Sequence, residues 1–69
     1  MTEVRAEMVA NVWKVLVTDG ATVADGDTLV ILESMKMEIP VLAEEAGTVS
    51  GLVAEGVVVQ EGDVIATIS

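Results

Sequence analysis

The residues with the clearest chemical potential lie together near the middle of the sequence, from Glu33 to Glu38, with Lys36 between two methionines. A lysine amine is a nucleophile once it has lost its proton. The chain has no His, Cys or Tyr that could serve as a catalyst, and its twelve acidic residues are spread over expected turns and strand edges rather than paired in a cleft. We therefore expect a protein that is not itself an enzyme, and Lys36 is the residue whose setting needs an explanation.

The setting of Lys36 is unusual for a turn. Turns usually contain Gly, Asn, Asp, Pro or Ser, because these residues fit the backbone angles or satisfy its polar groups. Here the large apolar side chains of Met35 and Met37 flank the lysine. One interpretation is that both methionines pack onto a sheet and Lys36 is merely solvated. The other is that the segment presents the amine for chemistry, and these residues alone leave both interpretations open.

Composition limits the possible folds. A chain of 69 residues without Cys or His forms one domain, residues 1–69, with neither a disulfide nor a thiolate or imidazole metal site. The hydrophobic content is 52%, supplied almost entirely by Val, Ile, Leu and Ala, and this valine-rich bias predicts an all-β fold. Asp25, Asp27 and Asp63 could suggest calcium, but the glycine beside each favours a tight turn.

The charge of the chain excludes two classes of partner. A net charge of -9 repels nucleic acid and anionic membrane surfaces. The longest stretch without a charged residue, residues 46–54, is far shorter than the ~20 apolar residues of a membrane span. The acidic and basic residues near the start also do not resemble a secretory signal. We expect a cytoplasmic protein that binds neither nucleic acid nor membranes.

The sequence contains an internal duplication. A shift of 36 positions aligns residues 10–33 with residues 46–69 and gives seven identities. The matched pairs are Ala10/Ala46, Leu16/Leu52, Val17/Val53, Gly20/Gly56, Val23/Val59, Gly26/Gly62 and Asp27/Asp63. Neither half can bury a core alone, so the two should pack face to face as a flattened barrel or sandwich. Residue 36 ends the first repeat, which places Lys36 at the tip of a hairpin.

Six strands are expected from the apolar runs. They cover residues 4–8, 12–17, 28–32, 39–43, 48–53 and 64–68. The run from Leu29 to Leu32 is apolar on both faces, as in a strand that is covered on each side. The glycines at the turns between strands can adopt positive φ without strain.

The segment Glu33-Ser34-Met35-Lys36-Met37 resembles the attachment motif of biotinyl domains, usually Glu-Ala-Met-Lys-Met. The likeness covers nearly the whole chain, because the glycines fall where the biotinyl/lipoyl attachment family has its turn glycines; they are Gly20, Gly26, Gly47, Gly56 and Gly62. The resemblance implies a flattened eight-stranded barrel-sandwich hybrid. It further implies biotin as an amide on Lys36, with Met35 and Met37 as the flanking residues that are recognised and Glu33 and Ser34 as the rest of the motif.

The family's chemistry implies three partners. A biotin protein ligase would make biotinyl-adenylate and attach biotin to Lys36, and it must help to deprotonate the amine, because lysine in water is almost entirely protonated near neutral pH. A biotin carboxylase and a carboxyltransferase would then load and unload a carboxyl group. A biotin reservoir is another possible role. The rivals are a lipoyl carrier, although lipoyl lysines usually follow an acidic residue, and an unmodified acidic interaction module.

Three features depart from the family pattern. Ser34 replaces the usual alanine, and Asn11 stands where a glycine is common, with Asn the residue next best able to adopt a left-handed conformation. The protruding thumb of some carriers has no counterpart in the sequence. Because Met1 and Ser69 bracket the domain closely, we expect a carrier that meets its enzymes in trans. We also expect the isolated protein to be a monomer.

Overall fold

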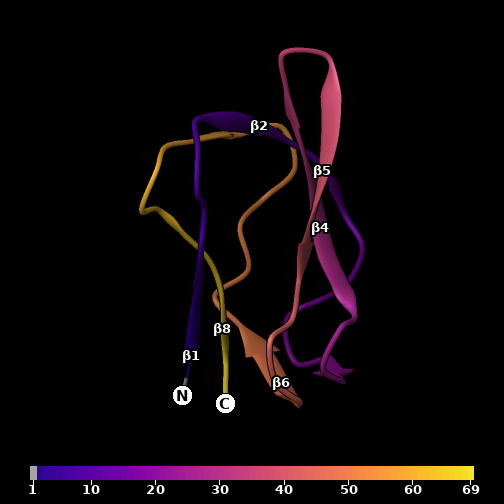
Figure 1. Cartoon of the computed structure of the whole chain (residues 1–69). Helices are drawn as coiled ribbons and strands as arrows, with labels where there is room; N and C mark the ends of the chain where they lie inside the picture. Colours follow the sequence, from indigo (N-terminus) through magenta and orange to yellow (C-terminus); the bar gives the residue numbers. More distant parts are fainter. Residues whose placement is uncertain (1) are drawn as a thin grey trace.

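The computed structural model describes residues 2–69, which form eight β-strands and no helix. The strands are β1 (Thr2–Arg5), β2 (Ala10–Val15), β3 (Thr22–Val23), β4 (Thr28–Ser34), β5 (Met37–Leu42), β6 (Gly47–Ser50), β7 (Val58–Val59) and β8 (Val64–Ile68). They make two four-stranded sheets around one hydrophobic core (Figure 1). This arrangement confirms the predicted all-β barrel-sandwich. In the part of the chain described, no helix is available to cross a membrane.

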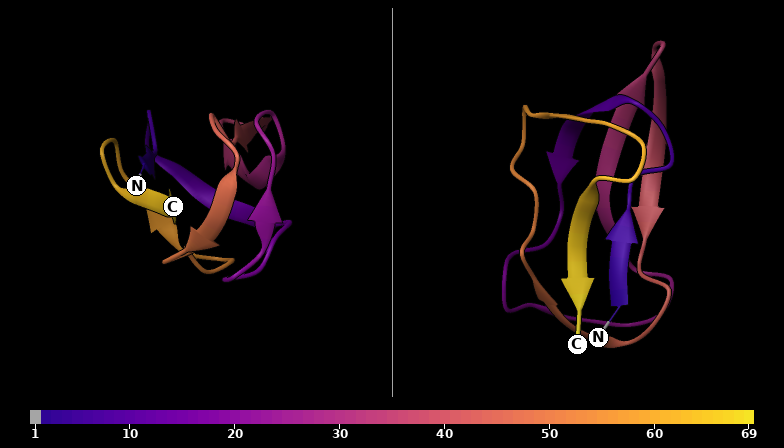
Figure 2. Two further views of the ribbon diagram at one scale, coloured as in Figure 1. Left: turned by 90° about the horizontal axis from the view of Figure 1, so that it is seen from below. Right: turned by 90° about the vertical axis from the view of Figure 1, so that its left-hand side faces the viewer.

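The two halves of the chain are interleaved. The sheets have the orders β1-β8-β6-β3 and β5-β4-β2-β7, and advancing each strand number by four turns the first order into the second. The two halves of the duplication are therefore related by a pseudo-two-fold axis, and each sheet contains two strands from each half. The predicted sandwich is correct, but the prediction that each half forms one of its two layers is wrong, because both sheets contain strands from both halves. Figure 2 shows the sandwich from two further directions.

Equivalent backbone hydrogen bonds in the two halves show which residues correspond in space. Gly26 N donates to Ala43 O at 2.8 Å, and Gly62 N donates to Ala6 O at 2.8 Å. The glycines differ by 36 positions, whereas the alanines differ by 37. The same offsets recur where Gly20 N donates to Val49 O at 2.7 Å and Gly56 N to Val12 O at 2.8 Å.

The offset changes between Leu16 and Asp19. Leu16 N donates to Leu29 O and Val53 N donates to Ile65 O, so Leu16 corresponds to Val53, 37 positions later, whereas Leu29 corresponds to Ile65, 36 positions later. The first half therefore has one extra residue between Leu16 and Asp19. The ungapped alignment is correct from Asp19 onward and wrong before it. Three of its seven identities do not correspond in space: Ala10/Ala46, Leu16/Leu52 and Val17/Val53.

The core depends on two matching β-bulges. In the pairing of β4 with β5 the register passes from Thr28 to Val30, and in the pairing of β8 with β1 it passes from Val64 to Ala66. The skipped residues, Leu29 and Ile65, have no exposed surface, and neither do the residues that follow them. A bulge places two consecutive side chains on the inner face. The apolar run of β4 therefore reflects a bulge and not, as predicted, a strand covered on both faces.

Several strand limits differ from the prediction. β8 is as predicted, β1 and β2 begin two residues earlier, and β6 ends at Ser50 instead of residue 53. The two-residue strands β3 and β7 were not predicted. Asn11 lies within β2 with an ordinary backbone conformation, so the expected left-handed residue is absent there.

Gly47 is also different from its predicted role, because it lies in β6 and not in a turn. A Cβ at this position would lie 2.7 Å from the carbonyl oxygen of Ser69 and 2.7 Å from Cγ2 of Ile68. Glycine is needed here for the close approach of two chain segments.

The aspartates beside the glycines close turns, as predicted. Asp27 accepts a hydrogen bond from Ala24 N at 2.9 Å through Oδ2, and its own N donates to Ala24 O at 3.0 Å. Asp63 forms the same pair of bonds with Gln60, at 2.8 and 2.9 Å. Gly26 and Gly62 have φ values of 94° and 91° in these turns, where only glycine is unstrained.

Candidate functional site

The hairpin of β4 and β5 projects from the end of the molecule opposite the chain termini (Figure 1). The ladder continues to its last pair, in which Ser34 is the partner of Met37. Only Met35 and Lys36 remain between these partners, so they are the two central residues of a two-residue turn. The predicted position of Lys36 at a hairpin tip is confirmed.

The turn holds both central residues in the left-handed region. The φ value of Met35 is 52° and that of Lys36 is 65°, and they are the only non-glycine residues with positive φ in residues 2–69. A two-residue turn with both φ positive matches the right-handed twist of the strands, but it favours Asn-Gly or similar pairs. A side chain in this conformation costs roughly 1–2 kcal/mol. The sequence at the tip is thus locally unfavourable for its own backbone.

A second local conflict lies just below the tip. Glu33 and Glu38 are directly opposite each other in the ladder, and both are exposed. Like charges in directly opposed positions weaken a strand pair. Strained residues and unfavourable pairs that persist in a fold are most common at functional sites. The hairpin tip therefore carries the features of a site maintained for a purpose other than stability.

The methionines do not cover the sheet. Met35 is 92% exposed and Met37 is 64% exposed, so the interpretation in which both pack down against the strands is wrong. Two exposed, flexible thioether side chains instead stand on either side of the lysine. They offer an adaptable apolar surface to any protein that approaches the tip.

The amine of Lys36 is free. Lys36 is exposed, and the one ion pair found within residues 2–69 joins Arg5 to Glu3. Lys14, in contrast, lies in β2 with its Nζ 5.5 Å from the ring centre of Trp13, an arrangement that allows a cation–π attraction. Of the two lysines, only Lys36 combines a projecting backbone with an unengaged amine.

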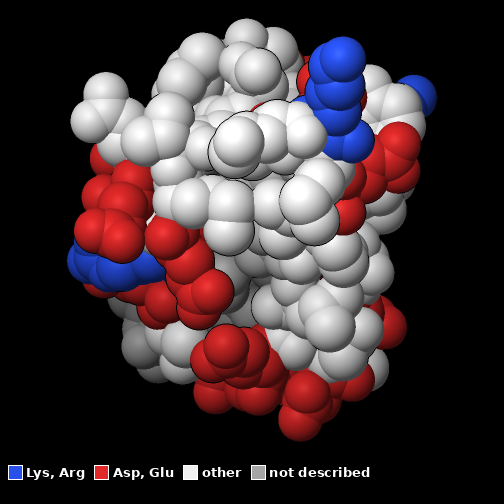
Figure 3. Space-filling model, turned by 45° about the horizontal axis from the view of Figure 1, so that its top comes forward, with Lys and Arg blue, Asp and Glu red and all other residues white. Residues whose placement is uncertain are grey.

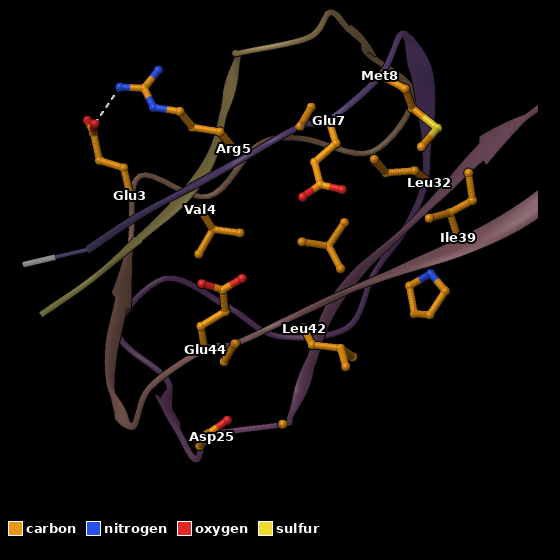
Figure 4. A pocket seen from close by; sticks show the side chains of 15 residues that line it. Glu3, Val4, Arg5, Glu7, Met8, Asp25, Leu32, Ile39, Leu42 and Glu44 are labelled. Atoms are coloured by element: carbon orange, nitrogen blue, oxygen red, sulfur yellow. Dashed lines mark hydrogen bonds and ion pairs between the residues drawn. The ribbon is translucent and has the colours of Figure 1, made fainter.

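A groove on the side of the sandwich does not include the hairpin tip, although Met8 lies at its margin. It lies between β1 and β5, the edge strands of the two sheets, and has a volume of about 630 Å³. Figure 4 shows Val4 and Leu42 at its apolar surface and the carboxylates of Glu7 and Glu44 turned toward it. None of residues 33–38 lines the groove. Glu33 borders a second hollow, which it shares with Asn11 and Trp13, but Met35 and Lys36 line neither. The tip that carries the amine is thus a projection and not a cleft.

The structure brings together the five residues that the sequence singles out. Glu33 and Ser34 end β4, Met35 and Lys36 form the turn, and Met37 begins β5. The sequence did not indicate that Met8, Val9, Val57 and Val58 are exposed at the same end of the sandwich. The only available signal was that Val9, Val57 and Val58 stand outside the expected strands, whereas Met8 was expected to end the strand at residues 4–8.

Comparison with known proteins agrees with this geometry. Residues 2–68 match the model of the biotin/lipoyl family, which is described as "Biotin-requiring enzyme". The chain is 59% identical to the "Biotinylated protein TB7.3 homolog" of Mycobacterium leprae, over 97% of this chain and 96% of that protein. It is 45% identical to the "Biotin/lipoyl attachment protein" of Bacillus subtilis, over 96% and 92% of the two chains.

Among solved structures, the crystal structure of the Kluyveromyces lactis urea carboxylase contains a similar region. The TM-score is 0.90 with 32% identity, and the match covers 99% of this chain but 6% of that one. The likeness is therefore to one small part of a large enzyme. Taken with the match across residues 2–68, it shows that this chain belongs to the biotin/lipoyl attachment family.

Proposed function

We propose that this protein is a biotin carrier, in which biotin is joined as an amide to Nζ of Lys36 and carries carboxyl groups from a biotin carboxylase to a carboxyltransferase. Biotin as the covalent cofactor is supported by the family match and by relatives named as biotinylated proteins. The transfer role is supported by a 47% identical region in the "Biotin-dependent acyl-coenzyme A carboxylase alpha3 subunit" of Mycobacterium leprae. This region covers 94% of the present chain and 11% of that subunit.

The observation that carries the proposal is the two-residue turn. Its left-handed backbone holds Met35 and Lys36 beyond the last ladder pair, Ser34 and Met37. A lysine that only needed to be solvated would not require this conformation. The turn fixes where the side chain begins, and the flexible side chain lets its amine reach an enzyme.

In the attachment reaction, the neutral amine of Lys36 attacks the acyl carbon of biotinyl-adenylate. A C–N amide bond forms, the bond from that carbon to the phosphate oxygen breaks, AMP leaves, and the amine loses a proton. Within residues 2–69 no hydrogen bond or ion pair joins a carboxylate to Lys36, and the carboxylates of the hairpin, Glu33 and Glu38, belong to the ladder pair below the turn. The ligase must therefore supply the base.

Once attached, biotin supplies a ureido nitrogen that can accept a carboxyl group and release it to an acceptor. The protein's own contribution is position. The eight-stranded core stays folded while the arm at Lys36 moves between enzymes, and the exposed tip needs no opening of the fold to become accessible.

The experiment that tests the proposal is an intact-mass measurement with fragmentation on protein produced together with an active biotin protein ligase. One biotinyl group on Lys36 is expected, with Lys14 unmodified. The matched control, Lys36→Arg, should remain unmodified and change the free energy of unfolding by no more than ~0.5 kcal/mol, as is usual for exposed sites. A lipoyl group on Lys36, or no modification at all, would contradict the proposal.

A further inference from the structure

Large apolar side chains gather at the end of the sandwich that carries Lys36. Nine such side chains are exposed in residues 2–69, and six of them belong to the hairpin tip or to the connections beside it. We call these six the apolar cap: Met8, Val9, Met35, Met37, Val57 and Val58. The other three are Trp13, Leu16 and Leu42. Trp13 lines a hollow with Asn11, Glu33 and Gly56 beside the cap, whereas Leu16 and Leu42 lie next to Leu29 and Thr28 at the far end of the hairpin.

The sheet order explains why residues so distant in sequence meet at one end. In the sheet β5-β4-β2-β7, Asn11 of β2 is the partner both of Glu33 in β4 and of Val58 in β7. Val9 directly precedes β2 at this end, and Val12 N donates to Val57 O at 2.8 Å. The strand residues just below the hairpin tip and the starts of β2 and β7 are therefore neighbours in one sheet, and the tip projects beyond β2 (Figure 1).

The apolar cap contrasts with the rest of the surface, which is rich in carboxylates. Figure 3 shows a broad white area at this end, with a basic side chain projecting at its upper right and carboxylates at its sides and below it. Glu7 adjoins Met8 in the sequence, and Glu33 and Glu38 lie at the base of the tip. Glu33 shares a ladder row with Asn11 and Val58, so carboxylates border the apolar side chains at this end. In a protein of net charge -9, such a cluster of exposed apolar side chains is a mark of an interaction surface.

We propose that the apolar cap is the docking surface for the biotin protein ligase, beyond the Met-Lys-Met segment itself. This inference rests on the proposed function, because an enzyme that reaches Nζ of Lys36 must cover the tip. Met8, Val9, Val57 and Val58 are then specificity-determining residues for attachment. The surface fits an apolar hollow with basic residues at its margin, complementary to the cap and to the surrounding carboxylates.

The test is the kinetics of biotin transfer by purified ligase with ATP and biotin, using the unmodified protein as the varied substrate. Val9→Asp and Val58→Asp place a carboxylate at positions that are each 61% exposed in the free protein. Docking would bury that charge without a partner. The KM for the carrier should rise about tenfold or more, while kcat changes less than twofold, because Lys36 and its turn are intact.

Two matched controls are available on the same molecule. Leu16 and Leu42 are 51% and 45% exposed. Leu42 pairs with Thr28 at the far end of the hairpin, and Leu16 N bonds to Leu29 O beyond the end of β2. Leu16→Asp and Leu42→Asp should leave KM within twofold of the wild-type value. Thermal unfolding of all four variants shows that each is folded under the assay conditions.

The outcomes separate this inference from the proposed function. Wild-type protein that accepts no biotin would refute the proposed function. Wild-type protein that accepts biotin, with cap variants whose KM equals that of the controls, would overturn the docking surface alone. Added salt should weaken the contribution of the carboxylates but leave the cap effect in place, and a cap effect abolished by salt would also overturn the inference.

Discussion

The turn at the hairpin tip should be a place where the protein can easily be made more stable. Replacing Met35 by Asn and Lys36 by Gly would install the pair that two-residue hairpin turns prefer. Met35 is 92% exposed and Lys36 has no ion pair within residues 2–69, so little packing or charge interaction is lost. The relevant change is the relief of two residues with φ values of 52° and 65°.

The size of the gain can be estimated residue by residue. A side chain in the left-handed region costs roughly 1–2 kcal/mol, whereas glycine at position 36 would add about 0.5–1 kcal/mol of chain entropy to be lost on folding. Lys36→Gly should therefore stabilise by about 0.5–1 kcal/mol. Met35→Asn should add about 0.5 kcal/mol, since Asn tolerates this conformation. The double variant should gain about 1–1.5 kcal/mol.

The assay is urea and thermal unfolding followed by circular dichroism. For a domain of this size, each kcal/mol moves the midpoint by about 4–8 °C. Gly20→Ala is the matched control, because Gly20 has a φ of 89° with open space around it, and this substitution should destabilise. A double variant no more stable than the wild type would refute the argument that the presenting turn is strained.

Four other substitutions probe the scaffold that holds the tip. Gly47→Ala should destabilise by about 1–3 kcal/mol, because its Cβ would lie 2.7 Å from Ser69 O; unchanged urea unfolding would show that the segments can separate freely. Gly26→Val and Gly62→Val should each cost about 1 kcal/mol or more and by similar amounts, given their φ values of 94° and 91°; neutral substitutions would contradict the description of these turns. Asp63→Ala should cost about 1 kcal/mol through loss of the bond from Gln60 N, and equal stability would mean that water replaces this bond.

Much of the fold was predictable because one signal, the repeated Gly-Asp turns, reflects a strict backbone requirement. Gly26 and Gly62 mark equivalent turns that only glycine enters without strain. The single-residue offset before Asp19 was missed because a chain rich in Val and Ala gives chance identities at a wrong register. β3 and β7 are two residues long, and they exist through pairing with distant strands, which local sequence does not encode.

The site was predictable in position but not in conformation. The repeat boundary and the Met-Lys-Met segment both indicated a tip at Lys36. Local propensity, however, argues against a left-handed Met35 and Lys36, since neither residue favours positive φ. The closing of the ladder at Ser34 and Met37 imposes it. The exposed cap was also hidden from sequence, because Val9 and Val58 become neighbours of the tip only through the sheet order.

The most direct measurement of the central claim compares the rates at which purified ligase modifies the wild type and two exchanged variants. In one variant Met35 and Lys36 change places, and in the other Lys36 and Met37 change places, so composition and charge are kept. Position 37 is the first residue of β5 and is paired with Ser34, whereas position 35 is the first central residue of the turn. Both variants should stay folded, with thermal midpoints near that of the wild type, yet should incorporate biotin far more slowly, as followed by intact mass. Incorporation at the wild-type rate in either variant would contradict the claim that this turn presents one particular lysine.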